Sequence, residues 1–364
     1  MRRHLATILT MVLMFFTALP ARADFKVGDL VRSQSVDTVY VISADGKRYT
    51  FFSNPIYHTW YDNFSRVKFI GEKELASIPF GGVMFVRPGT KMVKVRTDPK
   101  VYAVASGGIL RPVKDEATAV AIFGPTWNKQ IMDLDDAFFA QYFIGTEIDD
   151  PDDYVVAYER HLAGEAENVL LRPTRGGATS APTVSATKPP ATIAINDGFY
   201  AELTATGTRS IRNILMASNG AVFARCDQIG DCGGLAGPFR TGSTQGVDAY
   251  VCDLNGTCRR VGVGTTSVIA SAPATGLSVS LSATSTSVAR GAKLTLTATA
   301  TSPSGISRTI VGQDGGTRST CENQGRCTLT TAPLTDPGTF TYSASTCDAG
   351  NRCAFSTPIT ITVR

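Results

Sequence analysis

Two kinds of hydrophobic periodicity divide the chain. From about residue 191 to the end, apolar and polar residues alternate with period two over short segments. Such alternation is typical of strands that bury one face. The clearest segments are KLTLTATAT (293–301), SRTIVGQ (307–313), FTYSAST (340–346) and ITITV (359–363). We therefore expect this half of the protein to be all-β.

The N-terminal half combines strand patterns with helical ones. VYVISADGKRYTF (39–51) and VYAVASGGILRPV (101–113) each show a strand, a glycine turn and a second strand, which is the pattern of a β-hairpin. A helical segment follows each hairpin, at 55–64 and at 116–124. The matching order predicts two α+β modules, each a hairpin followed by helix.

Eight cysteines lie in the C-terminal half, and their spacing indicates a duplication. Both sets follow C-x5-C-x19-C-x5-C, and each cysteine of the second set lies 95 residues after its counterpart. A constant offset without a gap predicts two copies of one domain. The cysteines are Cys226, Cys232, Cys252, Cys258, Cys321, Cys327, Cys347 and Cys353.

Three uses of these cysteines are open. Five intervening residues that include a turn place two cysteines on adjacent strands, at a separation that suits a local disulfide. Crossed pairing between the two clusters of one copy is the second alternative, because sequence alone does not choose among connectivities. A metal site is the third, although zinc knuckles usually have only about two to four intervening residues. We favour local disulfides.

The first 23 residues have the features of a secretory signal peptide. The basic pair Arg2-Arg3 precedes an apolar stretch (5–19), and the triplet ARA (21–23) supplies a small-x-small cleavage site. The stretch is short for a membrane span, which needs about 20 residues. We expect an exported mature protein that begins at Asp24, has no transmembrane segment and is secreted or held at the cell surface. Such a compartment favours disulfides.

Charge and motifs exclude several classes of function. The formal charge of +4 falls to +1 when the signal peptide and its three arginines are removed, so the basic surface that nucleic-acid binding needs is not expected. The two histidines of the mature chain, His58 and His161, lie in no metal-binding pattern, and no nucleophile elbow, P-loop or dinucleotide motif is present. We therefore predict no enzyme activity, no nucleic-acid partner, no cofactor and no metal ion.

Two further clusters have more than one interpretation. Tyr57, Trp60, Tyr61 and Phe64 recur at helical spacing, and such a stripe usually packs in a core. We expect Trp60 and Phe64 to be core residues, and regard Tyr57, Trp60 and Tyr61 as a possible binding surface for a sugar ring or a protein.

The acidic segments DLDDAFF (133–139) and IDDPDD (148–153) lack the EF-hand spacing. A helix start at Asp135-Asp136 and a solvated loop explain them, and Ca²⁺ binding stays an open alternative.

Two resemblances add to this picture. CDAGNRC (347–353), together with Asp336-Pro337-Gly338 ahead of Tyr342, resembles bacterial Ig-like repeats over about 195–364. That resemblance implies Ig-like sandwiches, in which the Tyr342 hydroxyl caps a nearby backbone group.

The segment RPGTKMVKVRTDPKVYAVASGGILRPV (87–113) is similar to an uncharacterised repeat of exported bacterial surface proteins, above all secreted proteins of candidate-phyla bacteria. This resemblance covers about 27–150 and implies cell-surface association without an agreed activity. The first copy departs from the pattern, since Tyr49-Thr50 stand where the second copy has Arg111-Pro112.

The predicted fold class is multidomain, with tandem α+β hairpin-helix modules followed by two all-β Ig-like sandwiches. A Pro/Ser/Thr-rich stretch (172–190) predicts an extended linker, so we expect the two halves to tumble separately. The expected divisions are a signal peptide (1–23), a first module (24–86), a second module (87–161), a linker (162–190), Ig-like domain 1 (191–272) and Ig-like domain 2 (273–364).

The leading hypothesis is a non-catalytic surface or secreted protein for attachment or recognition, with the Ig-like domains as a stalk and an envelope glycan or surface protein as partner. A targeting or inhibitory subunit that binds cell-wall glycan or a protease is the second hypothesis. An enzyme in 24–161 without a recognisable motif is the third.

Overall fold

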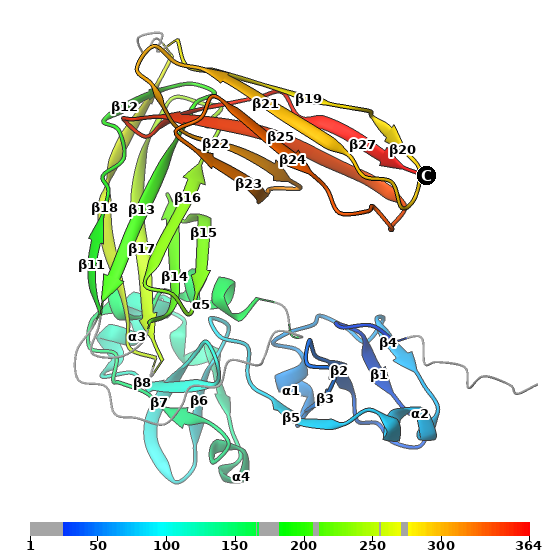
Figure 1. Ribbon diagram of the computed structural model, residues 1–364. Helices are drawn as coiled ribbons and strands as arrows, with labels where there is room; N and C mark the ends of the chain where they lie inside the picture. The colour runs from blue at the N-terminus through cyan, green and yellow to red at the C-terminus, as the bar shows by residue number, and fades with distance from the viewer. Residues whose placement is uncertain (1–24, 165, 167–181, 207–210, 255, 271–275) are drawn as a thin grey trace, which may run out of the picture.

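The computed structural model describes residues 25–164, 166, 182–206, 211–254, 256–270 and 276–364. The predicted signal peptide and most of the predicted linker lie outside the described residues. The protein is mostly β, and its four folded units follow one another along a bent path (Figure 1). Among the described residues, no helix is long and apolar enough to cross a membrane.

The first N-terminal unit is built on a five-stranded sheet with the order β4-β1-β2-β3-β5. The strands β2 and β3 form the predicted hairpin, with Gly46 at φ 74° in its turn. The elements are β1 (Leu30–Arg32), β2 (Tyr40–Ile42), β3 (Arg48–Phe51), α1 (Asn54–Tyr57), β4 (Val67–Phe69), α2 (Glu72–Ser77) and β5 (Phe80–Met84).

The second N-terminal unit has a five-stranded sheet with the order β10-β8-β7-β6-β9. The elements are β6 (Met92–Val95), β7 (Asp98–Ala105), β8 (Ile109–Pro112), α3 (Glu116–Phe123), η1 (Trp127–Gln130), β9 (Ile131–Asp133), α4 (Asp136–Phe139), β10 (Phe143–Ile144), η2 (Pro151–Asp153) and α5 (Val156–Ala163). Read in the opposite direction, this strand order matches that of the first unit, and the outer pairs β1/β4, β6/β9, β3/β5 and β8/β10 are all parallel. Tyr40 lies opposite Thr50 as Tyr102 lies opposite Pro112.

The first sandwich packs the sheet β12-β18-β17-β14-β15 against a layer formed by β11, β13 and β16. Its strands are β11 (Thr183–Ala186), β12 (Thr192–Ala194), β13 (Gly198–Thr206), β14 (Ile211–Ser218), β15 (Ala221–Asp227), β16 (Asp231–Ala236), β17 (Ser243–Asp253) and β18 (Cys258–Ile269). Apolar side chains from both layers form its core, as alternation in the sequence predicts.

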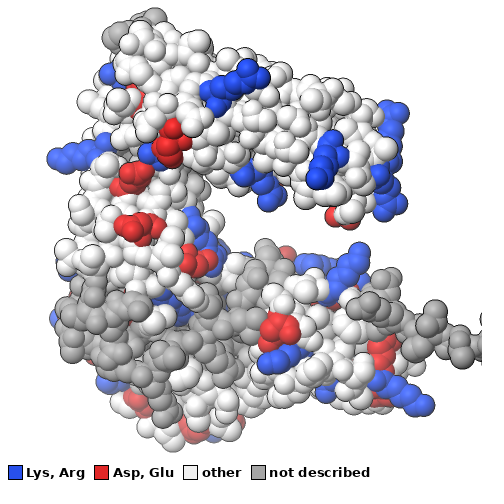
Figure 2. Space-filling model, viewed as in Figure 1, with Lys and Arg blue, Asp and Glu red and all other residues white. Residues whose placement is uncertain are grey.

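The second sandwich repeats this arrangement. Its strands are β19 (Ser278–Ala283), β20 (Ser287–Val288), β21 (Thr295–Thr301), β22 (Ile306–Gln313), β23 (Gly316–Glu322), β24 (Arg326–Thr330), β25 (Gly338–Asp348), β26 (Arg352–Phe355) and β27 (Ile359–Val363). The strands β22 to β25 each begin 95 residues after β14 to β17, which confirms the offset read from the cysteines. In the face shown in Figure 2, both sandwiches present mainly uncharged side chains.

The β14–β15 and β22–β23 turns show why the repeat keeps a turn dipeptide. Asn219 and Gly220 have φ of 46° and 81°, and Asp314 and Gly315 have φ of 49° and 84°. Two consecutive positive φ values define the tight hairpin turn that Asn-Gly and Asp-Gly favour. The side chains of Asn219 and Asp314 also accept a backbone N–H from the neighbouring strand, at 2.7 and 2.8 Å.

All eight cysteines form local disulfides, each between partners six residues apart. Local pairing is therefore confirmed, and crossed pairing and thiolate metal sites are wrong. Cys252–Cys258 and Cys347–Cys353 close hairpins, as the spacing predicts. The other two bridges, Cys226–Cys232 and Cys321–Cys327, instead join strands that belong to the two opposite sheets of a sandwich.

The Tyr342 hydroxyl does not cap the backbone, contrary to the expectation from the Ig-like resemblance. Tyr342 is fully buried in the second sandwich core, and its hydroxyl has no hydrogen-bond partner among the described residues. Burial raises the pKa of this hydroxyl. The Tyr342 ring therefore serves as core volume.

The predicted linker and the separate tumbling of the two halves both need correction. Leu162 and Ala163 belong to α5, and residues 183–186 form β11, which pairs with β13 of the first sandwich; residues 167–181 lie outside the described residues. The two halves also share a core cluster in which Tyr158 and Leu162 of α5 pack with Leu215, Tyr250 and Cys252 of the sandwich. Buried contacts between α5 and the first sandwich thus join the two halves. The composition of the linker gives no sign of these contacts.

Candidate functional site

Helix α1 is too short to carry the predicted aromatic stripe. It ends at Tyr57, so the expectation of a helix over 55–64 is wrong. Just beyond it, the Thr59 hydroxyl donates a hydrogen bond to the Ile56 carbonyl at 2.7 Å. A side chain that bonds to the backbone in this way competes with further helical turns.

The three residues predicted as a binding surface are mostly internal. Tyr57 is 2% exposed and donates its hydroxyl to the Asn63 carbonyl at 2.9 Å, so it is a core residue and not a surface anchor. Trp60 is half-buried and donates its Nε1–H to the Phe85 carbonyl at 2.8 Å. Tyr61 is half-buried and packs edge-on against Phe51, with ring centroids 6.1 Å apart.

Phe64, expected in the core, is 44% exposed. Its ring stacks on Tyr57 with the centroids 4.4 Å apart, so the outer face of Phe64 is free to meet solvent. This pair forms one wall of a depression of about 770 Å³, which we call the aromatic groove. Its lining residues are Arg32, Val36, Asp37, Thr38, Val39, Phe51, Phe52, Ser53, Asn54, Tyr57, Phe64, Val67 and Phe69.

The aromatic groove gathers exposed apolar side chains. Val36, Phe64 and Phe69 are 47%, 44% and 61% exposed. Isolated exposed apolar residues are ordinary, but their concentration in a concave surface is typical of an interaction site. The three come from the β1–β2 connection, the segment after α1 and strand β4, and the sheet order brings them together.

The charged groups of the groove neutralise each other. Arg32 Nη2 lies 2.6 Å from Asp37 Oδ1, and the Arg32 guanidinium sits 5.0 Å from the centroid of the Phe69 ring. Because the Asp37 side chain is almost fully solvated, this ion pair contributes little to stability. The groove therefore offers apolar rings and one neutralised ion pair, which suits a ligand face without net charge.

The region of the second unit that corresponds to the groove is built differently, although its sheet has the same strand order. Two residues separate β6 from β7, whereas seven residues (33–39) connect β1 to β2 and form one side of the groove. Lys94 lies opposite Asp133 in the β6–β9 pair as Arg32 lies opposite Phe69 in the β1–β4 pair. Lys94 and Asp133 form an ion pair at 3.6 Å where the first unit exposes a ring. The long β1–β2 connection and the exposed Phe69 ring are thus features of the first unit that the second unit does not repeat.

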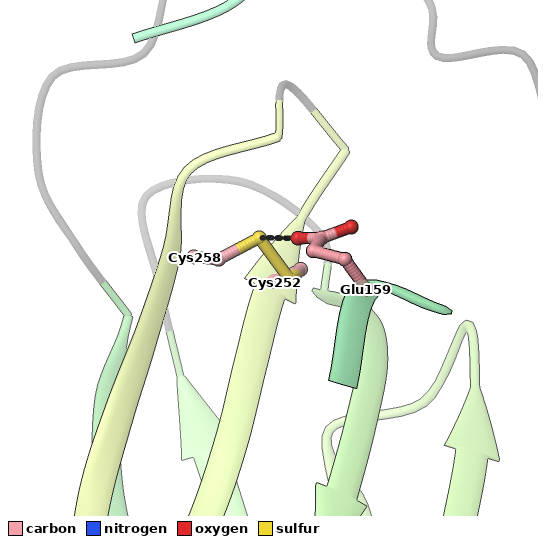
Figure 3. Close-up of side chains that lie close together, drawn as sticks. All are labelled: Glu159, Cys252 and Cys258. Carbon is pink, nitrogen blue, oxygen red and sulfur yellow. Dashed lines mark hydrogen bonds between the residues drawn. A yellow bond between two sulfur atoms is a disulfide. The ribbon is translucent and has the colours of Figure 1, made fainter. Parts of the chain in front are cut away.

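A second cluster lies where α5 meets the first sandwich. Glu159 Oε1 is 3.7 Å from Cys258 Sγ, and ligand atoms of Glu159, Cys252 and Cys258 all lie within 4.8 Å of one another (Figure 3). Both sulfur atoms belong to one disulfide, so neither is a thiolate that could bind a metal ion. The cluster is a packing contact between two units.

Glu159 is fully buried at this contact. Burial raises the pKa of its carboxyl group, and this is opposed by hydrogen bonds from the Ser106 N–H at 2.7 Å and the Tyr250 hydroxyl at 2.8 Å, and by the charges of Arg111 and Arg212. Burial likewise lowers the pKa of Arg212 to about 10, opposed by Glu159. The carboxylate and the two guanidinium groups compensate one another in a dry environment.

The acidic segments have local partners. Asp135 accepts the Ala137 N–H at 2.9 Å and caps α4, which confirms the predicted helix start. Asp150 caps η2, and Asp152 pairs with Arg260 of the first sandwich at 2.5 Å. These contacts support structural roles for both segments.

No protein-family model matches the chain, and no curated protein matches it. Among solved structures, fibronectin(III)-like modules of Clostridium thermocellum CbhA match with a TM-score of 0.22 and 13% identity, over 50% of this chain and 92% of that chain. A chimeric titin Z1Z2 functionalized with a peptide from decorin matches with a TM-score of 0.20 and 12% identity, over 51% of this chain and 99% of that chain. At such TM-scores the similarity carries no argument about function.

Proposed function

We propose that this is a non-catalytic exported protein for attachment or recognition, in which the aromatic groove binds an envelope glycan or a surface protein and the two sandwiches act as a disulfide-clamped stalk. The observation that carries the proposal is the gathering of Val36, Phe64 and Phe69 in one concave surface. Exposed rings supply contact area at low entropic cost, both for sugars and for apolar protein segments.

The duplicated strand order supports this assignment. We take the two N-terminal units as copies of one hairpin-helix module, because their sheets agree in order and direction. The second copy uses the corresponding region for an ion pair and a short connection. Because the second copy folds with a short connection and an ion pair in this region, the long connection and the exposed ring of the first copy are better explained by binding than by folding.

The signal-peptide pattern and the four disulfides support an extracellular or cell-surface location, because disulfides form and persist in oxidising compartments. A targeting or inhibitory subunit that uses the same groove against cell-wall glycan or a protease is the second candidate. An enzyme is less well supported. Among the described residues that line the groove, Asp37 is the single carboxylate, whereas glycoside hydrolysis uses a pair.

Replacing both Phe64 and Phe69 by alanine is expected to weaken binding of the mature protein to isolated cell envelope by about tenfold or more, because each ring is an exposed anchor. Phe80→Ala is the matched control, since Phe80 is 57% exposed in the same unit but lies outside the groove lining. Co-sedimentation with envelope that has been treated with protease or with glycan hydrolase separates the two ligand classes. Equal loss in the Phe80 variant, or no loss in the double variant, would contradict the proposal.

A further inference from the structure

The two disulfides of each sandwich differ in where they lie. Cys252–Cys258 and Cys347–Cys353 join adjacent strands of one hairpin with Cα atoms 4.1 Å apart, and we call them the junction bridges. Cys226–Cys232 and Cys321–Cys327 join opposite sheets within one sandwich, and we call them the intersheet bridges. Each junction bridge lies beside the unit that precedes its own sandwich.

The first junction bridge lies next to the second N-terminal unit. The β17–β18 hairpin that it closes supplies Tyr250, whose hydroxyl donates to Glu159 of α5 at 2.8 Å. The hairpin turn comes so close to strand β8 that a Cβ on Gly256 would lie 2.6 Å from Ile109 Cδ1. Arg212, at the start of the neighbouring strand β14, donates to the Ser106 carbonyl at 2.5 Å. The hairpin is therefore the centre of this contact.

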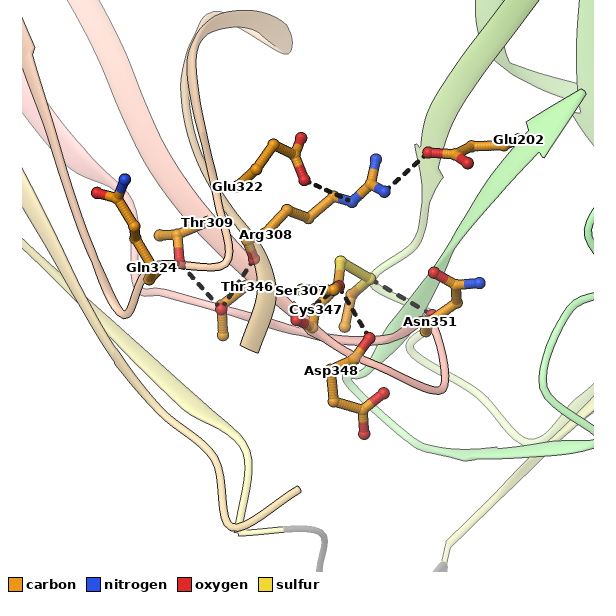
Figure 4. Close-up of polar contacts among 11 residues, drawn as sticks. Glu202, Ser307, Arg308, Thr309, Glu322, Gln324, Thr346, Cys347, Asp348 and Asn351 are labelled. Carbon is orange, nitrogen blue, oxygen red and sulfur yellow. Dashed lines mark hydrogen bonds and ion pairs between the residues drawn. A yellow bond between two sulfur atoms is a disulfide. The ribbon is translucent and has the colours of Figure 1, made fainter. Parts of the chain in front are cut away.

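The second junction bridge lies next to the first sandwich, as the first bridge lies next to the second N-terminal unit (Figure 4). Cys353 lies opposite Gly198 in a short antiparallel pairing of β26 with β13, and the Tyr200 N–H donates to the Asn351 carbonyl at 3.0 Å. Arg308, which is 95 residues after Asn213 of β14, reaches across to Glu202 at 2.7 Å and covers the Tyr200 ring at 3.7 Å. The two contacts thus use equivalent strands of the two sandwiches.

We propose that the junction bridges hold each sandwich against the preceding unit, whereas the intersheet bridges stabilise only their own sandwich. A bridge across the hairpin limits the conformations of the turn before it meets its neighbour, so less entropy is lost when the contact forms. In this way two disulfides fix the second N-terminal unit and the two sandwiches relative to one another.

Cys252→Ser/Cys258→Ser in the mature full-length chain tests the proposal, with Cys226→Ser/Cys232→Ser as a control in the same sandwich and with the same spacing of six. Hydrogen–deuterium exchange is followed at the Ser106 amide and along α5. The junction variant is expected to exchange there about tenfold faster or more, and the control to stay within about twofold of the wild type. Equal exchange in the two variants, whether raised or unchanged, overturns the proposal.

The second junction gives an independent comparison. Cys347→Ser/Cys353→Ser is expected to raise exchange at the Tyr200 amide, and Cys321→Ser/Cys327→Ser is expected to leave it unchanged. If loss of the first bridge unfolds its own sandwich, the comparison at the Tyr200 amide decides the proposal. Equal exchange there in the two variants overturns it.

Discussion

Glu159→Leu is expected to lower the free energy of unfolding of the contact between α5 and the first sandwich by about 3–5 kcal/mol, the usual cost of removing one member of a buried charge pair. The loss would remove the buried carboxyl group that acts on both Arg111 and Arg212, which would then keep Asp153 and Asp227, respectively, as acidic neighbours. It would also leave the Ser106 N–H without its acceptor. Native-state hydrogen exchange of that amide measures the effect directly.

Glu159→Gln is the matched control, because glutamine keeps the shape of the side chain and a carbonyl for the Ser106 N–H while it removes the charge and replaces the oxygen that accepts from Tyr250 by an NH2 group. We expect a smaller loss of stability than in the leucine variant. A leucine variant as stable as the wild type would contradict the role given to the carboxylate.

The Glu159→Gln variant is also expected to change how the stability of the contact depends on pH. Burial raises the pKa of Glu159, and it also raises the pKa of Asp153 and Asp248 nearby. A carboxyl group with a raised pKa binds its proton more tightly in the folded state. Its contribution to stability therefore falls as the pH rises from the ordinary glutamate range through the raised pKa. Glu159→Gln should make the stability less dependent on pH than in the wild type as the pH rises above the ordinary glutamate range.

The C-terminal half is predictable because its signals are local. The period-two alternation predicts the bounds of β21, β22, β25 and β27 to within a few residues, and the constant offset between the cysteines predicts the duplication. A six-residue separation with a turn between partners favours local pairing, because the chain brings the two sulfur atoms close together. The two intersheet bridges show the limit of this reasoning, because which sheet each strand joins depends on the whole sandwich.

The groove and the buried junction depend on contacts that no local pattern records. Arg32 and Phe69 become neighbours through parallel pairing of two strands that are each only three residues long, and such strands show no usable period. Glu159 stands in VAYERHLA, where its neighbours predict an ordinary solvated helix face. Its burial follows from the docking of a hairpin about 90 residues further along the chain, at Tyr250.

Tyr57→Ala is expected to lower the free energy of unfolding of the first N-terminal unit by about 3–5 kcal/mol, as truncation of a large buried aromatic ring usually does. Tyr57 is 2% exposed and packs against Phe51 and Phe64, with ring centroids 5.1 and 4.4 Å away. Trp60 lies in the same unit and Trp127 in the other. Urea unfolding in a Trp127→Phe background is therefore followed by the fluorescence of Trp60, which packs against the core cluster that contains Tyr57.

Phe64→Ala, measured in the same background, distinguishes the core from the groove surface. Phe64 is 44% exposed, so its truncation should cost about 1 kcal/mol or less. Tyr57→Phe should fall between the two, because it keeps the ring volume and loses only the hydrogen bond to the Asn63 carbonyl, which is worth about 1 kcal/mol. If Phe64→Ala destabilises the unit as much as Tyr57→Ala, Phe64 belongs to the core, and its ring is not available to a ligand.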